Sequence, residues 1–328
     1  MDRALWFVAP RQVELRPIEL PPLCPGDALV RTLCSGISAG TEMLAYRGEL
    51  PDDLDVDESI ASLAGTFTYP FQYGYSCVGQ IEELASAVDG LGVGDLVFAF
   101  HPHQERFVAA ASALLPVPEL DPRQATLLPY VETALQIALD AGPVLGETVV
   151  VSGLGALGLL VAALLDRSGG HVVAIEPQAW RRAVASELGI LAVDTEHTGD
   201  AGGTSGVPLV IECSGSPAAL VTALDLLAHE GTVLVASWYG SKPVSLPLGG
   251  RFHRRRLTIR STQVSTIPAS QSARWTHRRR LAHAVELCKS LPLSMLATDT
   301  VAFDEADVGY ARVDAETPGL IHLAFGYR

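Results

Sequence analysis

The stretch from Val149 to Leu160 restricts the fold of this chain more than any other part of the sequence. Valines, which favour a β-strand, run into a Gly-x-Gly-x-x-Gly turn at 153–158, and an apolar helical pattern follows. Gly153 allows a tight turn, Gly155 leaves room for close backbone approach, and Gly158 lets the helix pack against the strand. The free N–H groups and the positive dipole end of that helix predict a site for the pyrophosphate of a dinucleotide.

An acidic residue stands where such a site would hold a ribose. The apolar run 171–175 ends in Glu176, about 20 residues after the glycine turn. A carboxylate there accepts from ribose hydroxyls and repels a 2′-phosphate, so NAD(H) is favoured over NADP(H). Two alternatives stay open. Arg181 and Arg182 could reach a phosphate rather than form a solvated helix face, and the glycines could belong to an ordinary buried strand–turn–helix. The agreement of strand, spacing, helix and acid favours the cofactor site.

The charge of the whole chain restricts its partners. Its 23 basic and 37 acidic residues give a formal net charge of −14, which favours a small-molecule substrate and disfavours nucleic acid and anionic membrane. Basic runs at 253–256 and 277–280 are therefore interpreted as ion pairs within the fold or as part of an interface. The cysteines are scattered without Cys-x-x-Cys spacing, and no signal-peptide pattern is present at the N-terminus. We expect a cytoplasmic protein without a disulfide framework.

The strand and helix patterns divide the chain into a β-rich beginning and an alternating α/β part. Short strands are predicted at 4–8, 13–17, 28–33, 75–82 and 96–100, followed by a long helix at 123–141. Strands at 148–152, 171–176, 207–212, 232–237 and 256–261 then alternate with helices at 156–167, 178–188 and 216–229. This alternation predicts an α/β fold with a doubly wound parallel sheet. A helix near 272–290 and a strand near 319–326 close the chain.

Two stretches have no clear period. Residues 48–66 contain an acidic cluster, and we interpret them as a solvated loop, with a lid over a cleft as the alternative. The cluster consists of Asp52, Asp53, Asp55, Asp57 and Glu58. Residues 194–206 are rich in Gly, Thr and Asp, and they predict an irregular link in place of one crossover helix.

Segments across nearly the whole chain resemble the medium-chain dehydrogenase/reductases. Residues 34–42 resemble that family's Cys-Gly-Ile-Cys-Gly-Thr-Asp motif with one residue inserted, 71–79 its Gly-His-Glu-x-x-Gly motif, and 131–134 its Glu-Pro-Leu-Ala segment. Residues 100–104 and 237–240 are similar to the zinc-type alcohol dehydrogenase-like subgroup, and 35–42 to the bacteriochlorophyllide dehydrogenases. The resemblance implies a GroES-like catalytic domain at 1–122, a Rossmann dinucleotide-binding domain at 123–265, a C-terminal return to the catalytic domain at 266–328, and a homodimer.

The same resemblance identifies residues that depart from the family pattern. In its zinc-dependent members a Cys, a His and a third Cys or Glu hold the catalytic metal, and these positions correspond to Ser38, Tyr75 and Glu132. The glutamate after the histidine corresponds to Ser76. A serine hydroxyl and a neutral phenol are poor Zn²⁺ ligands beside thiolate and imidazole. The four cysteines of the family's structural zinc lobe are also missing. We therefore expect no catalytic and no structural zinc.

Without a metal, hydrogen-bond donors must stabilise the substrate oxygen and move its proton. Tyr75 is the first candidate donor, with a core tyrosine bonded to backbone as the alternative. Thr41 corresponds to the family's proton-relay hydroxyl, or it is only a turn residue. Ser38 stands where the thiolate was, either as a catalytic hydroxyl or as a small filler.

Three further residues are candidates for proton transfer. Glu132 could act as a general base if desolvation raises its pKa, or it could be a structural partner of Tyr75 or of an arginine. His101 and His103 follow the strand at 96–100 and could relay a proton. Histidines of a surface loop are the alternative for this pair.

These features predict a zinc-independent oxidoreductase that transfers a hydride between a nicotinamide cofactor and an alcohol/carbonyl group of a small organic substrate. One alternative is an NAD(P)H-dependent enone or quinone reductase, and another is a cofactor-binding protein without redox turnover or with a non-redox step. The predicted cofactor-binding residues are Gly153, Gly155, Ala156, Leu157 and Gly158 in the turn, Glu176, and also Thr133, Ser214, Ser237, Trp238 and Thr262.

Overall fold

A computed structural model describes residues 1–57, 60, 62–198 and 204–328 of the chain. These residues form two compact units, Met1–Pro129 with Leu287–Arg328, and Tyr130–Glu286. Glu58 of the acidic cluster, and residues 199–203 of the predicted irregular link, lie outside the described residues.

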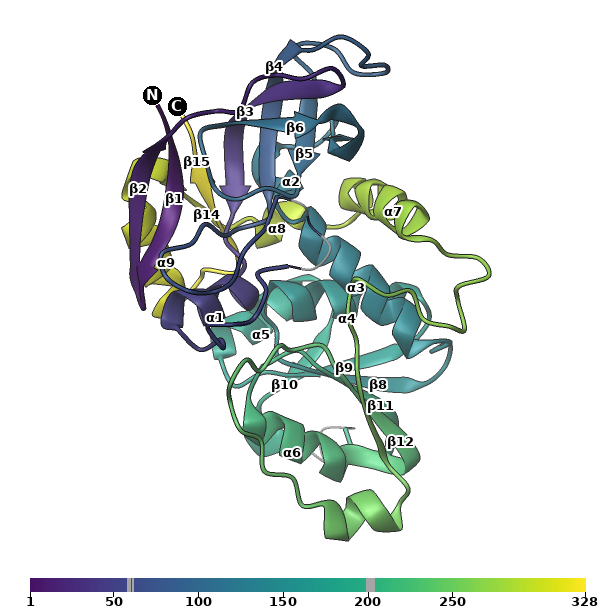
Figure 1. The fold of residues 1–328 in the computed structure, drawn as a ribbon. Helices are drawn as coiled ribbons and strands as arrows, with labels where there is room; N and C mark the ends of the chain where they lie inside the picture. The colour runs from purple at the N-terminus through teal and green to yellow at the C-terminus, as the bar shows by residue number, and fades with distance from the viewer. Residues whose placement is uncertain (58–59, 61, 199–203) are drawn as a thin grey trace. The chain divides into compact units, whose positions relative to one another are not determined.

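The unit Tyr130–Glu286 is built on a parallel sheet with the strand order β10-β9-β8-β11-β12-β13 (Figure 1). The strands are β8 (Thr148–Ser152), β9 (His171–Ile175), β10 (Leu191–Val193), β11 (Val207–Glu212), β12 (Leu227–Val235) and β13 (Thr258–Ser261). The valines of β8 are 0–1% exposed, as expected for a central strand covered on both faces. The order reverses between β8 and β11, which defines the doubly wound topology and confirms the predicted fold class.

Helices cover both faces of this sheet. The helices α4 (Ala156–Arg167) and α5 (Ala179–Glu187) follow β8 and β9, and α6 (Pro217–Leu226) follows β11. Right-handed crossovers that run in opposite directions from the centre place α4 and α5 on one face and α6 on the other (Figure 1). The remaining helical segments are α3 (Leu128–Ala141), α7 (His277–Ser290) and the short η2 (Thr195–His197) and η4 (Leu248–Phe252).

The β-rich unit contains an antiparallel sheet with the order β14-β15-β3-β4-β5-β7, with β6 paired to β3, and a separate β1-β2 hairpin. The strands are β1 (Asp2–Ala9), β2 (Gln12–Ile18), β3 (Asp27–Gly36), β4 (Cys77–Leu84), β5 (Leu96–Ala99), β6 (Arg106–Ala110), β7 (Leu115–Pro116), β14 (Asp299–Ala302) and β15 (Leu323–Gly326). The helical segments are α1 (Thr41–Arg47), η1 (Ala111–Ala113), α2 (Pro122–Ala125), α8 (Leu293–Leu296), η5 (Phe303–Glu305) and α9 (Ala306–Asp314). Because β15 pairs with β3, the C-terminal segment completes this sheet. Among the described strands of this sheet, β14 and β15 are the pair that runs parallel.

An aromatic core holds the β-rich unit together. Phe7 stacks on Phe71 with ring centroids 5.3 Å apart, and its ring also meets the edge of Tyr310 at 5.3 Å. Tyr310 and Phe325, both fully buried, come from α9 and β15. Distant parts of the chain therefore share one core, which surrounds α1.

Several predicted boundaries differ from the observed ones. The long helix predicted at 123–141 is two helices, α2 and α3. The helix predicted to end at 229 ends at Leu226, because Leu227 is extended (ψ 143°) and already begins β12. The helix α7 begins at His277 rather than near 272. No helix among the described residues is long and apolar enough to cross a membrane.

Candidate active site

The glycine turn joins β8 to α4 at the point where the strand order reverses. Gly153 has φ 93°, and a Cβ there would lie 2.7 Å from Ser214 Cα in the loop after β11. A Cβ on Gly158 would lie 1.9 Å from the carbonyl oxygen of Gly153, so only glycine lets α4 begin this close to β8. A Cβ on Gly155 would meet nothing within 4 Å. This open position before Ala156 and Leu157, at the N-terminus of a long helix, fits a pyrophosphate.

Glu176, directly after β9, holds the glycine turn in place through a hydrogen bond to its backbone. Its carboxylate is 2% exposed and accepts from the backbone N–H groups of Leu154 and Gln178, each at 2.9 Å. Arg182 donates to the carbonyl oxygens of Glu176 and Pro177. Arg181 lies 3.8 Å from the Glu176 carboxylate, and its guanidinium stacks on Trp180. Both arginines therefore have partners next to the acid.

A second buried acid organises the loop after β11. Glu212 is fully buried, and its Oε1 accepts from the N–H groups of Ser214 (2.7 Å) and Gly215 (3.1 Å). Its Oε2 accepts from the Tyr239 hydroxyl at 2.9 Å. Ser237 Oγ accepts from Gly215 N–H at 2.8 Å. Ser214 and Ser237 are thus brought together at the carboxyl edge of the sheet, whereas the side chain of Trp238 is 42% exposed.

Sequence reasoning missed Glu212 and Tyr239. A signal for Glu212 was present, because Glu212 ends an apolar strand just as Glu176 follows one.

Polar side chains one turn apart line one face of α3. Glu132 pairs with Arg280 of α7 at 2.9 Å, and Arg280 also donates to Gln136 at 2.5 Å. Asp140 accepts from Gln136 at 3.0 Å and from the Thr262 hydroxyl at 2.6 Å. Burial raises the pKa of Glu132, and the Arg280 guanidinium opposes that rise. Of the roles considered for Glu132, the contact with an arginine is the one observed; Thr133 follows it on α3 and is half-buried.

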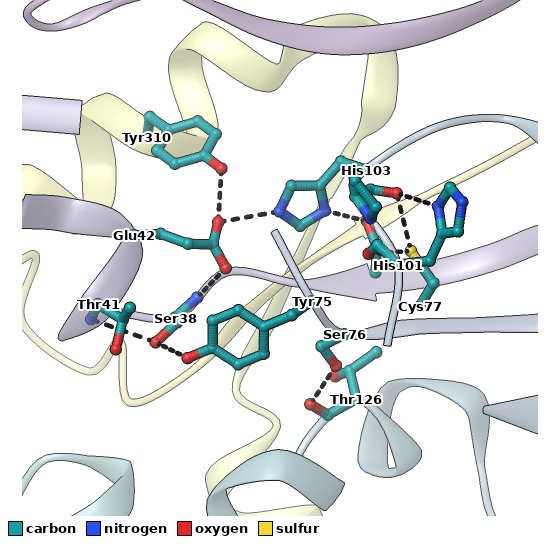
Figure 2. A network of polar contacts seen from close by, with 12 residues as sticks. Ser38, Thr41, Glu42, Tyr75, Ser76, Cys77, His101, His103, Thr126 and Tyr310 are labelled. Carbon is teal, nitrogen blue, oxygen red and sulfur yellow. Dashed lines mark hydrogen bonds and ion pairs between the residues drawn. The ribbon is translucent and has the colours of Figure 1, made fainter. Parts of the chain in front are cut away.

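Ser38 and Tyr75 form a hydroxyl pair in the β-rich unit (Figure 2). Tyr75 Oη donates to Ser38 Oγ at 2.6 Å, and the backbone N–H of Thr41 donates to the same oxygen at 3.4 Å. Glu42 of α1 accepts from the Ser38 N–H at 2.8 Å. This reciprocal arrangement is similar to a helix capping box that is one residue longer. Ser38 is 4% exposed, and its position is fixed by both its backbone and its side chain.

His103 lies next to Glu42 (Figure 2). The Glu42 Oε2 atom is 2.9 Å from His103 Nε2 and accepts from the Tyr310 hydroxyl at 2.7 Å. His103 Nδ1 lies 2.7 Å from Ser35 Oγ. Both Glu42 and His103 are fully buried, so the surface-loop interpretation of His103 is wrong. The Glu42 carboxylate links His103 to the backbone N–H of Ser38. Because a peptide N–H does not transfer its proton in ordinary chemistry, this route carries no proton between His103 and the Ser38 hydroxyl.

Glu42 and Tyr310 were not identified from the sequence. The Thr-Asp end of the family motif that 34–42 resembles was the signal for Glu42.

His101 has different surroundings from His103. Its ring stacks on Phe107 with centroids 4.2 Å apart, and its Nδ1 lies 3.0 Å from the carbonyl oxygen of Pro102. Burial lowers the pKa of His101 to about 4, so the ring is neutral near pH 7. The two histidines therefore do not form one functional pair.

The side chains at the positions of the family's metal ligands do not fit zinc. Ser38 and Tyr75 are bonded to each other, Glu132 to an arginine, and Ser76 donates to the carbonyl oxygen of Thr126 at 2.7 Å. Burial raises the pKa of Cys34, near these residues in the sequence, to about 11, which keeps that thiol protonated. No cluster of three His, Cys, Asp or Glu side chains that could hold a metal occurs in the described part of the chain.

Comparisons with known proteins agree with the sequence resemblance. The profile of the zinc-binding dehydrogenases matches residues 156–279. The 2-desacetyl-2-hydroxyethyl bacteriochlorophyllide A dehydrogenase of Cereibacter sphaeroides is 27% identical over 345 residues, which cover 99% of this chain and 98% of that protein. The chain is thus similar to the zinc-type alcohol dehydrogenase-like proteins over nearly its whole length. The D-guloside 3-dehydrogenase of Escherichia coli is 27% identical and covers 84% of this chain and 85% of its own.

Solved structures show the same fold. The 2R,3R-butanediol dehydrogenase of Bacillus subtilis superposes on this chain with a TM-score of 0.80 at 20% identity, covering 99% of each chain. The resemblance inferred from local motifs is thereby confirmed, and the protein is an oxidoreductase of the nicotinamide-dependent dehydrogenase/reductase class. The matching profile is named for zinc binding, in contrast to the hydroxyl side chains of Ser38 and Tyr75.

Proposed function

We propose that this protein transfers a hydride between NAD(H) and a secondary alcohol or its ketone without zinc, and that Ser38 and Tyr75 handle the substrate oxygen. The observation that carries the proposal is the 2.6 Å hydrogen bond between the two hydroxyls. Ser38 and Tyr75 stand at the sequence positions where zinc-dependent members of the family hold their metal.

Hydride transfer needs a group that stabilises charge on oxygen and moves one proton. A bound nicotinamide ring supplies or accepts the hydride. In ketone reduction the carbonyl oxygen becomes negative, and a hydroxyl that donates to it lowers the barrier. In alcohol oxidation the same hydroxyl pair accepts the proton of the substrate. A mutually bonded pair of hydroxyls, held at Ser38 by its backbone and its side chain, is preorganised for both directions.

The surroundings of Glu176 support NAD(H) over NADP(H). A 2′-phosphate would meet a carboxylate that is already held against the turn by two backbone N–H groups. The nearby arginines already have partners, since Arg182 donates to backbone carbonyl oxygens and Arg181 stacks on Trp180, 3.8 Å from the Glu176 carboxylate. The ribose hydroxyls of NAD(H) can use the remaining lone pairs of the carboxylate.

The proposed substrate class comes from the relatives. The names of the D-guloside 3-dehydrogenase and the (R,R)-butanediol dehydrogenase point to a hydroxyl on a carbon with two carbon neighbours. A secondary alcohol/ketone pair is therefore the class to test first. A homodimer, as the family resemblance implies, is part of the same proposal.

A turnover screen tests the proposed function. Butane-2,3-diol, L-threonine, a methyl guloside and 1-phenylethanol are offered with NAD⁺, and acetoin, acetophenone, cyclohexenone and benzoquinone with NADH. We expect turnover of alcohols and ketones only. Turnover of the enone or quinone alone would support the double-bond reductase instead, and binding of NADH without any turnover would support a non-catalytic protein.

A further inference from the structure

The hydroxyl hydrogens of the Ser38–Tyr75 pair can be assigned from their partners. A hydroxyl group has one hydrogen to donate and two lone pairs to accept with. Ser38 Oγ accepts from Tyr75 Oη at 2.6 Å and from Thr41 N–H at 3.4 Å, so both lone pairs are used. The hydrogen of the Ser38 hydroxyl is therefore left to donate to a third partner. Tyr75, by contrast, has given its only hydrogen to Ser38.

We propose that Ser38 is the catalytic residue that donates a hydrogen bond directly to the substrate oxygen, and that Tyr75 in turn donates a hydrogen bond to Ser38. This inference rests on the proposed function, and it specifies which of the two hydroxyls contacts the substrate oxygen. A carbonyl oxygen is a pure acceptor, so it must meet the hydroxyl whose hydrogen is left to donate, and that hydroxyl belongs to Ser38.

The backbone around Ser38 supports this assignment. Glu42 accepts from the Ser38 N–H at 2.8 Å, and its carboxylate is held in turn by His103 and Tyr310. The anchor is fully buried, whereas Ser38 is 4% exposed and Tyr75 is half-buried. A serine held in this way keeps its Cβ–Oγ bond in one direction, which is what a donor to a transition-state oxygen requires.

The proton moves along the oxygens of Tyr75, Ser38 and the substrate, and each O–H bond that breaks is matched by one that forms. In ketone reduction the π electron pair of the carbonyl moves onto oxygen as the hydride reaches carbon, and this oxygen takes the hydrogen of Ser38. The Ser38 oxygen takes the hydrogen of Tyr75, and the Tyr75 phenolate regains a proton from water. Alcohol oxidation moves the protons in the opposite direction.

Single and double variants test which of the two hydroxyls contacts the substrate oxygen. The panel of secondary alcohols and ketones described above is used with Ser38→Ala, Tyr75→Phe and the double variant. Ser76→Ala is the matched control for serine, since Ser76 is also 4% exposed but bonds a backbone carbonyl. Tyr69→Phe is the control for tyrosine, since Tyr69 donates to the carbonyl oxygen of Ala45. NADH affinity and thermal unfolding are measured for every variant.

We expect Ser38→Ala to lower kcat by about 10²–10³-fold, as loss of a direct donor to a transition-state oxygen does. Tyr75→Phe should lower kcat by less, and the double variant should lose no more than Ser38→Ala, because Tyr75 acts through Ser38. A larger loss in Tyr75→Phe than in Ser38→Ala, or a Ser38→Ala loss no greater than that of Ser76→Ala, would overturn this assignment alone. Absence of wild-type turnover would overturn the proposed function together with it.

Discussion

The carboxylate of Glu132 lies 2.9 Å from the guanidinium of Arg280, with only 9% and 4% of the two side chains exposed. This pair connects α3 to α7 within one unit. Glu132 is also the residue that the family resemblance equates with a third metal ligand, and in this structure its charge is neutralised by an arginine.

Glu132→Ala should lower the free energy of unfolding by about 3–5 kcal/mol, because it leaves the Arg280 charge buried without a partner. Urea denaturation checks this. The exposed pair Glu14–Arg16 provides the control, and Glu14→Ala should cost less than about 1 kcal/mol. The double variant Glu132→Leu/Arg280→Met should recover part of the loss, since neither charge then remains. A Glu132→Ala cost equal to the control would contradict the buried ion pair.

Substitutions in the glycine turn should separate cofactor binding from folding. Gly158→Ala places a Cβ 1.9 Å from a backbone oxygen, so it should lower the melting temperature. Gly155→Ala meets no protein atom within 4 Å, so it should leave the melting temperature unchanged but weaken NADH binding at least tenfold, about 1.4 kcal/mol. Calorimetry measures both quantities. Equal NADH affinity in Gly155→Ala and the wild-type protein would argue against a pyrophosphate at this turn.

The choice between NADH and NADPH should depend on the charge of Glu176. Glu176→Gln keeps an oxygen to accept from the backbone and removes the negative charge, so it should bind NADPH more tightly than the wild-type protein does. Titration calorimetry with both cofactors gives the ratio of dissociation constants. If the wild-type protein binds NADPH more tightly than NADH, the role assigned to Glu176 is wrong.

The stability of the protein should fall in mild acid because of His322. Burial lowers its pKa to about 4, whereas an unfolded histidine titrates near 6.5. The unfolded chain therefore binds the proton first. The free energy of unfolding is unaffected by this group above about pH 6.5 and decreases as the pH falls towards 4, by about 2 kcal/mol between pH 7 and pH 5. Urea denaturation at both pH values should show a smaller decrease in His322→Gln. An identical decrease in the variant would show that other groups cause it.

The strand, glycine turn and acid of the proposed cofactor site could be located from the sequence because these parts are local. Gly153, Gly158 and Glu176 are joined by one strand–helix–strand unit, and their spacing is set by the geometry of that unit. The alternating pattern also predicted β8, β9 and β11 to within one residue of each end, whereas β12 begins five residues before the predicted start at 232.

The support of the hydroxyl pair could not be predicted because its contacts are long-range. Glu42 meets His103 from 61 residues away and Tyr310 from 268 residues away. No periodicity encodes such pairings, and α1 itself is seven residues long, too short for a clear helical pattern. The same reason explains why His103, in a segment without regular structure, looked like a loop histidine although it is fully buried.

The most direct test of the central claim is the zinc content of the protein whose turnover is being measured. Elemental analysis is combined with turnover of the secondary alcohol panel before and after treatment with a chelator. We expect full activity in protein with far less than one zinc per chain, unchanged by the chelator and not increased by added Zn²⁺. One stoichiometric zinc per chain, with activity that is lost on chelation and restored by Zn²⁺, would contradict it.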